Sequence, residues 1–177
     1  MSQWNRLLSY GIIGLAMILG SPVRQTSAGG PEVFFSPNGG IPERILRSIN
    51  LSRRTIDVAM FSFTSGELAR ALAAAHHRGV RVRILLDSDQ VEDPNSEYRF
   101  LVDEGLTVRL LSGRPPRGIL HDKFVIFDGR EVATGSYNWT HSADRYNHEN
   151  IVFFGDALAN AFQKQFDKLW SIGRTGK

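Results

Sequence analysis

The chain has 177 residues, enough for one ordinary domain with a buried core. It is 42% hydrophobic and 22% charged, which is normal for a globular protein, and its formal net charge is +3. The absence of cysteine excludes a disulfide scaffold, a thiolate zinc site and a cysteine nucleophile.

The first 28 residues have the pattern of an export signal. Arg6 precedes an apolar run over residues 7–19, and the small residues Thr26 and Ala28 fit a cleavage site before Gly29. The run is short for a membrane span, which needs about 20 apolar residues. We expect a cleaved signal peptide over 1–28 and a single domain over 29–177, exported to the periplasm or secreted. An uncleaved membrane anchor is the alternative.

Removing residues 1–28 would take away two arginines and no acidic residue, which lowers the net charge to +1. The overall charge therefore does not by itself indicate a nucleic-acid partner. Any such indication has to come from where the basic residues lie.

The first half of the remaining chain alternates strands and helices. Residues 33–35 predict a short strand, and Pro42 suits the start of a helix that runs to about residue 51. Residues 55–63 predict a buried strand, Ser65 an N-cap, and Gly79 the end of the following helix. Residues 80–86 predict the next strand. This strand–helix–strand unit indicates two parallel strands.

The second half contains more strands than helices. The patterns predict a helix over 95–103, a strand over 107–111, a proline-containing loop over 112–118, strands over 123–127 and 131–134, a strand over 150–154 and a helix over 157–170. Asp128-Gly129 predicts the tight turn of a hairpin. The whole predicts a layered α/β/α sandwich with a mixed, mostly parallel sheet of about seven strands.

The chemistry is concentrated in residues 121–138, which read HDKFVIFDGREVATGSYN. His121 and Lys123 are two residues apart at a strand start, so their side chains share a face. Ser136 and Asn138 are also two apart, and the hairpin could bring the two pairs together. Lysine neutralises phosphate oxygens, while the hydroxyl and the amide donate hydrogen bonds to them. A neutral imidazole can attack phosphorus and form a covalent intermediate.

These residues form the pattern H-x-K-x4-D-x6-G-S-x-N, which matches the signature of the phospholipase D superfamily in every fixed position. The residues that carry it are His121, Lys123, Asp128, Gly135, Ser136 and Asn138. Together with the run Asn147 to Asn150, the pattern resembles the single-motif bacterial nuclease branch, which is similar also to the mitochondrial cardiolipin hydrolases. The resemblance extends over roughly residues 33–170.

The resemblance implies more than the motif alone. Family members place two motifs at one active site: one histidine attacks phosphorus, and the other protonates the leaving oxygen and then activates water. This chain carries one motif, so the resemblance implies a homodimer with His121 from each subunit at the two-fold axis. Glu149 corresponds to a family glutamate that hydrogen-bonds the histidine. Asp128 and Gly135 are interpreted as structural members of the motif, and no cofactor is implied.

A metal site is the main chemical rival to this interpretation. Its possible ligands are His121, Asp128, His141 and His148. The Lys123 ammonium on the same face as His121 argues against it, because it repels a divalent cation and suits an anion.

Basic and aromatic residues surround the motif. The arginines in the predicted flanking loops are Arg114, Arg117, Arg130 and Arg145. They form either a solvated surface or a rim that binds substrate phosphates; Arg114, Arg117 and Arg145 are weak candidates for substrate binding. Tyr137 and Trp139 could stack on bases, but packing in the core is favoured for both. Asp87 and Asp89 end a predicted strand, where helix capping or a turn is the favoured role.

The function predicted from the sequence is that of a metal-independent phosphodiesterase. It would be an exported endonuclease of low sequence specificity that hydrolyses DNA or RNA through a phosphohistidine. The alternative is a phospholipase D that acts on phosphatidyl or cardiolipin headgroups, because the same chemistry serves both substrates. A non-catalytic nucleic-acid-binding protein is the third hypothesis, and the complete motif weighs against it.

Overall fold

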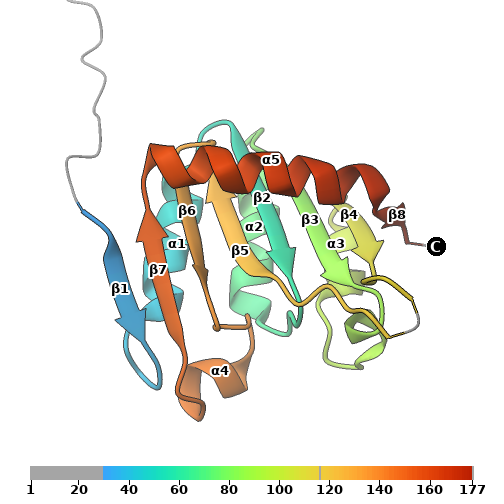
Figure 1. The fold of residues 1–177 in the computed structure, drawn as a ribbon, viewed down its shortest axis with the longest axis horizontal. Coiled ribbons are helices and arrows are strands. Elements are labelled where there is room, and N and C mark those ends of the chain that lie inside the picture. The colour runs from blue at the N-terminus through green and yellow to red at the C-terminus, as the bar shows by residue number, and fades with distance from the viewer. Residues whose placement is uncertain (1–29, 116, 177) are drawn as a thin grey trace, which may run out of the picture.

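The computed structural model describes residues 30–115 and 117–176, and its centre is one mixed β-sheet (Figure 1). In this part of the chain the sheet has eight strands in the order β1-β7-β6-β5-β2-β3-β4-β8. The strands are β1 Glu32–Phe35, β2 Thr55–Met60, β3 Arg81–Asp87, β4 Thr107–Leu111, β5 Lys123–Phe127, β6 Glu131–Gly135, β7 Asn150–Phe154 and β8 Arg174–Thr175.

The expectation of a mostly parallel sheet is wrong. Only the β2–β3 and β3–β4 pairs are parallel, and the other pairings are antiparallel. Parallel neighbours need a crossover connection, and α2 and α3 supply it between β2, β3 and β4. α5 carries the chain across the sheet from β7 to β8. β5, β6 and β7 are instead joined by a hairpin and by a connection that contains only the five-residue α4, without a crossover helix. They therefore add to the sheet in antiparallel fashion.

Helices cover both faces of the sheet, as the sequence predicted. They are α1 Ile41–Leu51, α2 Gly66–His77, α3 Tyr98–Asp103, α4 His141–Arg145 and α5 Asp156–Ile172, with a short 3₁₀ helix at Gln90–Glu92. In Figure 1, α5 runs across the front of the sheet, while α1, α2 and α3 lie behind it. Pro42 lies in the first turn of α1, and the Ser65 hydroxyl accepts the Leu68 N–H as N-cap of α2.

The sheet separates two apolar cores. The larger lies between the sheet and α1, α2 and α3, and includes Ile45, Leu72 and Val125. The smaller lies under α5 and includes Phe124, Ile126 and Phe166. Alternation along β5 sends its side chains to the two cores in turn. Both faces of β5 are therefore packed, which fixes the strand that begins at Lys123.

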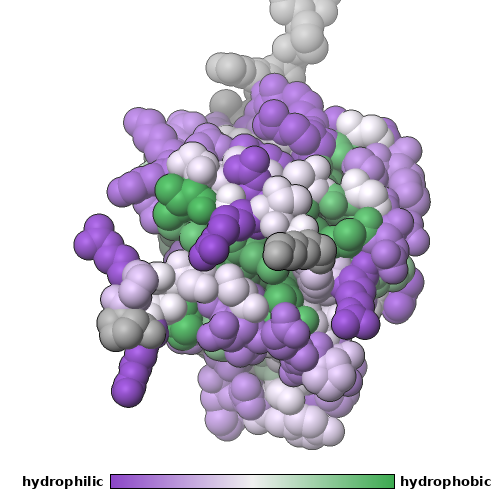
Figure 2. Space-filling model, turned by 90° about the vertical axis from the view of Figure 1, so that its right-hand side faces the viewer, coloured by the Kyte–Doolittle hydropathy of each residue, from purple (hydrophilic) through white to green (hydrophobic). Residues whose placement is uncertain are grey.

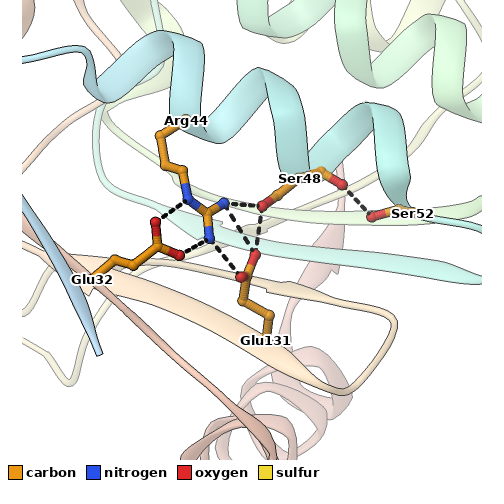
Figure 3. A network of polar contacts seen from close by, with 5 residues as sticks. All are labelled: Glu32, Arg44, Ser48, Ser52 and Glu131. Carbon is orange, nitrogen blue, oxygen red and sulfur yellow. Dashed lines mark hydrogen bonds and ion pairs between the residues drawn. The ribbon is translucent and has the colours of Figure 1, made fainter. Parts of the chain in front are cut away.

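A largely buried arginine ties α1 to two strands (Figure 3). The Arg44 guanidinium of α1 donates to Glu32 of β1 at 2.8 Å and to Glu131 of β6 at 2.7 Å. It also donates to Ser48, and it lies 4.0 Å from the ring centroid of Phe153. This network joins strands that are not neighbours, so it holds the β1–β7–β6 side of the sheet against α1.

The predicted signal peptide at 1–28 lies outside the described residues and stays a prediction. In residues 30–115 and 117–176, no helix is long and apolar enough to cross a membrane.

Candidate active site

The two halves of the sequence motif meet at one edge of the sheet, by which we mean the side where β2 and β6 end and β5 begins. In the β5–β6 hairpin Phe124 pairs with Thr134, so Lys123 and Gly135 lie together at the open end. His121 precedes β5, and Ser136 and Asn138 follow β6, at the lower edge in Figure 1. The hairpin therefore brings both pairs to the same edge, as its spacing predicted.

The aromatic ring of the residue that follows β2 contacts both members of the first pair, His121 and Lys123. The Phe61 ring meets the His121 imidazole edge-on, with centroids 4.8 Å apart. The Lys123 ammonium lies 4.9 Å from the same ring centroid and donates a hydrogen bond to the His121 carbonyl at 2.8 Å. His121 itself is exposed at the edge. The imidazole and the ammonium are thus held against one ring and open to solvent.

The residue after Phe61 links the second pair to the first. The Asn138 side-chain oxygen accepts the Ser62 N–H at 3.3 Å, and Ser62 in turn accepts the Trp139 N–H at 3.2 Å. The Asn138 oxygen is therefore occupied, which leaves its NH₂ group for a ligand. Phe61 and Ser62 were not predicted as site residues. Their only signal was that they extend a predicted strand beyond its paired part, since β2 ends at Met60 rather than at residue 63.

Glu149 forms the centre of a second cluster at this edge. One carboxylate oxygen accepts the Ser136 hydroxyl at 2.5 Å, and the other accepts the Asn147 amide at 3.1 Å. The Ser136 oxygen accepts the Asn150 N–H, and Ser36 accepts the Glu149 N–H. The carboxylate is therefore held through both of its oxygens. Neither Ser36 nor a contact role for Asn147 was predicted from the sequence.

No hydrogen bond joins Glu149 to His121 within the described part of this one chain, where the carboxylate binds Ser136 and Asn147 instead. The predicted contact between the glutamate and a histidine ring therefore stays a prediction.

Burial and charge oppose each other around Lys123. Partial burial lowers the pKa of the Lys123 ammonium, and the charges of Asp122 and Glu149 counteract this. Burial likewise raises the pKa of the Asp122 carboxyl, against the attraction of Lys123 and His121. The Lys123 ammonium is thus partly removed from water, beside the His121 imidazole. The negative charge of a bound phosphate would compensate the ammonium for the solvation that it has lost.

The part of the sequence that forms this site matches a known protein family. The sequence profile described as "Cardiolipin synthase, PLD-like domain" matches residues 45–170. The chain belongs to this PLD-like family. The matched range contains all of the motif and the strands that carry it.

Relatives and solved structures agree with this assignment. A mitochondrial cardiolipin hydrolase of Xenopus laevis is 39% identical over 128 residues, which cover 72% of this chain and 60% of the relative. A phospholipase D of Rickettsia bellii is 32% identical and matches 79% of this chain and 69% of its own length. The crystal structure of the phospholipase D family member Nuc from Salmonella typhimurium has a TM-score of 0.77 and 32% identity, and the match covers 84% of this chain and 98% of Nuc.

The chain spans about six tenths of the length of the cardiolipin hydrolase that it matches. The match to Nuc runs over nearly the whole of that chain, so the PLD-like domain is the common unit of all three similarities.

The aspartate of the PLD motif lies at the opposite edge of the sheet. The Asp128 carboxylate accepts the backbone N–H groups of Arg53, Arg54 and Thr55, the shortest at 2.7 Å. Burial alone would raise the pKa of Asp128, but these N–H donors outweigh it and hold the pKa below the ordinary value of 3.8. Asp128 thus ties the β5–β6 turn to the start of β2, a place from which it cannot touch a substrate at His121.

We expect Asp128→Asn to lower the free energy of unfolding by about 1–2 kcal/mol at neutral pH, because a charged acceptor of three N–H groups is lost. A depressed carboxyl pKa stabilises the fold above the unfolded-state pKa, and this contribution disappears as pH falls through the folded-state pKa. Urea unfolding at neutral and acidic pH measures both effects. The deficit of the variant should shrink in acid, and the exposed Asp103→Asn is the control. A deficit independent of pH would contradict this account.

The flanking arginines do not form one rim. Arg114 and Arg117 are exposed in the loop before His121, on the side of the motif. Arg145 pairs with Asp144 and donates to Asn38 at 3.0 Å. Arg130 is exposed after the Asp128 turn at the far edge of the sheet, away from His121, which fits the solvated surface that was one of its two proposed roles.

The remaining residues considered from the sequence lie in the core, in a turn or at the surface. Tyr137 and Trp139 are almost fully buried, which confirms core packing. Asp87 accepts the N–H groups of Asp89, Gln90 and Leu120, which confirms a turn role for that carboxylate. The exposed His141 ring packs edge-on against Tyr146. Across residues 30–115 and 117–176, no three His, Asp or Glu side chains form a cluster that could hold a metal ion.

Proposed function

We propose that the chain is a metal-independent phosphodiesterase, and specifically an endonuclease of low sequence specificity. The observation that supports this most is the convergence of His121, Lys123 and Asn138 around Phe61 and Ser62 at one open edge of the sheet. A cation, an amide donor and an exposed imidazole suit a phosphodiester, and similarity to the Nuc structure supports the same chemistry.

The proposed reaction proceeds in two displacements. The neutral His121 imidazole attacks phosphorus, the bond to the leaving oxygen breaks, and that oxygen takes a proton from a second, protonated His121. Lys123 and Asn138 hold the non-bridging oxygens. The second imidazole then removes a proton from water, which attacks phosphorus and breaks the phosphorus–nitrogen bond. Both histidines return to their starting states.

The second histidine in this scheme comes from another copy of the chain. The motif occurs once in the sequence, and its histidine is exposed rather than enclosed. A two-fold axis beside His121 would place two imidazoles on one phosphate. The Glu149 carboxylate, pinned by Ser136 and Asn147, would then face the ring of the other subunit. We further propose that residues 1–28 export the chain and that residues 29–177 form this domain.

Plasmid DNA incubated with the protein in EDTA should be nicked and then degraded, because no step requires a metal. Agarose gels follow the loss of supercoiled DNA. Cleavage that appears only after Mg²⁺ or Zn²⁺ is added would contradict the proposal.

Hydrolysis of phospholipid headgroups is the second candidate, favoured by the 39% identity to a protein named as a mitochondrial cardiolipin hydrolase. The same experiment includes cardiolipin vesicles and RNA at equal phosphate concentration. Turnover of lipid without nucleic acid would replace the endonuclease proposal with this one. An unprocessed N-terminus in the membrane fraction would favour it as well.

A further inference from the structure

A cleft of about 610 Å³ lies on the same edge as His121, beyond the loop that joins β4 to β5. Its walls come from that loop, through Ser112, Arg117 and Ile119, and from the C-terminal end of the chain, through Ile172 and Arg174. We name it the loop cleft. Figure 2 shows this side of the molecule, where hydrophilic side chains project around small, separate hydrophobic patches.

The walls of the loop cleft are held in place by the backbone. Ser112 and Ile119 form an antiparallel bridge, and the Gly118 N–H donates to the Arg114 carbonyl at 2.9 Å. A Cβ on Gly118 would lie 2.3 Å from the Arg114 nitrogen, so the loop closes tightly only with glycine there. On the other wall, β8 pairs with β4 through Leu110 and Arg174. The cleft is thus part of the fold.

The loop cleft is cationic. Arg117 and Arg174 line it, and neither forms an ion pair with any residue of the described ranges. Asp89 is the one acidic side chain in its lining. Guanidinium groups bind phosphate through paired N–H donors, so two unpaired arginines at one cleft favour a phosphate-bearing ligand.

The loop cleft is mechanically connected to the catalytic motif. Ile119 precedes His121 by two residues, a span of at most about 7 Å. Between them, the Leu120 N–H donates to the buried Asp87 carboxylate at 2.8 Å, which fixes this segment to the end of β3. Because the two places are so close, a polymeric ligand with one phosphate at His121 would reach the loop cleft if it ran along this edge.

We propose that the loop cleft holds the phosphates of a polynucleotide strand next to the phosphodiester being cleaved. This rests on the proposed function, because it takes His121 as the point of cleavage. A polynucleotide carries a phosphate at every nucleotide, so a strand bound at His121 presents further anions to Arg117 and Arg174. The half-exposed Ile119 and the exposed Ile172 offer apolar contact to sugar and base surfaces.

Binding of a fluorescein-labelled oligothymidylate, followed by anisotropy across a salt series, tests the proposal. The His121→Ala background prevents cleavage during the measurement. Adding Arg117→Ala and Arg174→Ala should weaken binding about tenfold and reduce the slope of log K against log salt by about 1.4, since two single-strand phosphate contacts are lost. The control pair, Arg81→Ala with Arg130→Ala, removes the same charge from the opposite edge and should leave the slope unchanged.

Equal affinity and slope in both double variants would overturn the inference. So would a loss of binding to phosphatidylglycerol vesicles, measured in parallel, without loss of oligonucleotide binding. Hydrolysis of bis(p-nitrophenyl) phosphate by the unmodified chain in EDTA tests the proposed chemistry separately. A failure there leaves the binding result readable, so the two failures are distinguishable.

Discussion

Replacing His121 with alanine should reduce turnover of plasmid DNA and of bis(p-nitrophenyl) phosphate by about 10⁴-fold or more, because the proposed nucleophile is lost. The side chain is exposed and its ring contacts Phe61 at the edge of the sheet. Its removal leaves no cavity in either core. The unfolding midpoint in urea should therefore stay close to that of the unmodified chain, while activity disappears.

His77→Ala is the matched control for this experiment. His77 is exposed at the end of α2, at the opposite edge of the sheet from His121, and its ring nitrogen lies 3.5 Å from Glu104. This variant should keep full activity. Residual turnover above a tenth of the original rate in His121→Ala would show that another group attacks phosphorus, and the nucleophile assignment would be wrong.

A proposed dimer gives the same substitution a second consequence. If each reaction uses one histidine from each subunit, then a mixed dimer with one His121→Ala subunit loses either the nucleophile or the acid. Activity in mixtures of the two proteins should therefore fall faster than the fraction of unmodified chains. A linear decline would indicate that one chain is sufficient.

Sequence alone predicted those elements whose pattern is local. The hairpin around Asp128-Gly129 was predicted because the apolar pattern of its strands and the residues of its turn follow one another in the sequence. The first strand, β5, has the predicted bounds. Two pairs of motif residues, His121 with Lys123 and Ser136 with Asn138, come to the same edge because a hairpin places its ends together whatever the surrounding sheet does. The capping role of Ser65 is equally local, since it depends on one hydroxyl and the N–H three residues later.

Contacts that depend on which strands are neighbours in the sheet could not be predicted from local patterns. Pairing of β5 with β2 brings Phe61 and Ser62 to the motif, and no local pattern encodes which strand lies beside which. Short elements failed for a different reason: α4 has five residues and β8 two, too few to show a period. The role of Arg130 stayed open because closeness in sequence to the motif does not distinguish the two ends of a hairpin.

The largest effect on stability is expected away from the motif, at a buried carboxylate in β2. Asp57 is 1% exposed and binds Arg83 through two hydrogen bonds of 2.7 Å. It also accepts the Gln163 amide of α5 at 2.9 Å. Hydrogen bonding to Asp57 raises the pKa of Arg83, against the opposing effect of burial. The Asp57 carboxylate of β2 thus joins β2 and the neighbouring β3 to α5, the helix that covers them.

Asp57→Ala should lower the free energy of unfolding by about 3–5 kcal/mol, because it leaves the largely buried Arg83 guanidinium without its main partner. Urea unfolding measures this loss. Asp167→Ala removes the other carboxylate on Arg83, which is 53% exposed, and should cost at most about 1 kcal/mol. Equal costs for the two variants would contradict the argument.

A third variant separates the value of the ion pair from the penalty of breaking it. Asp57→Ala combined with Arg83→Met replaces both charges with apolar groups, and should recover much of the stability lost in Asp57→Ala. The methionine would take over part of the contact that the Arg83 guanidinium makes with the Phe166 ring, 4.8 Å away. Recovery would mean that α5 is held mainly by apolar packing, and that the ion pair matters because neither charge can be left alone in the core.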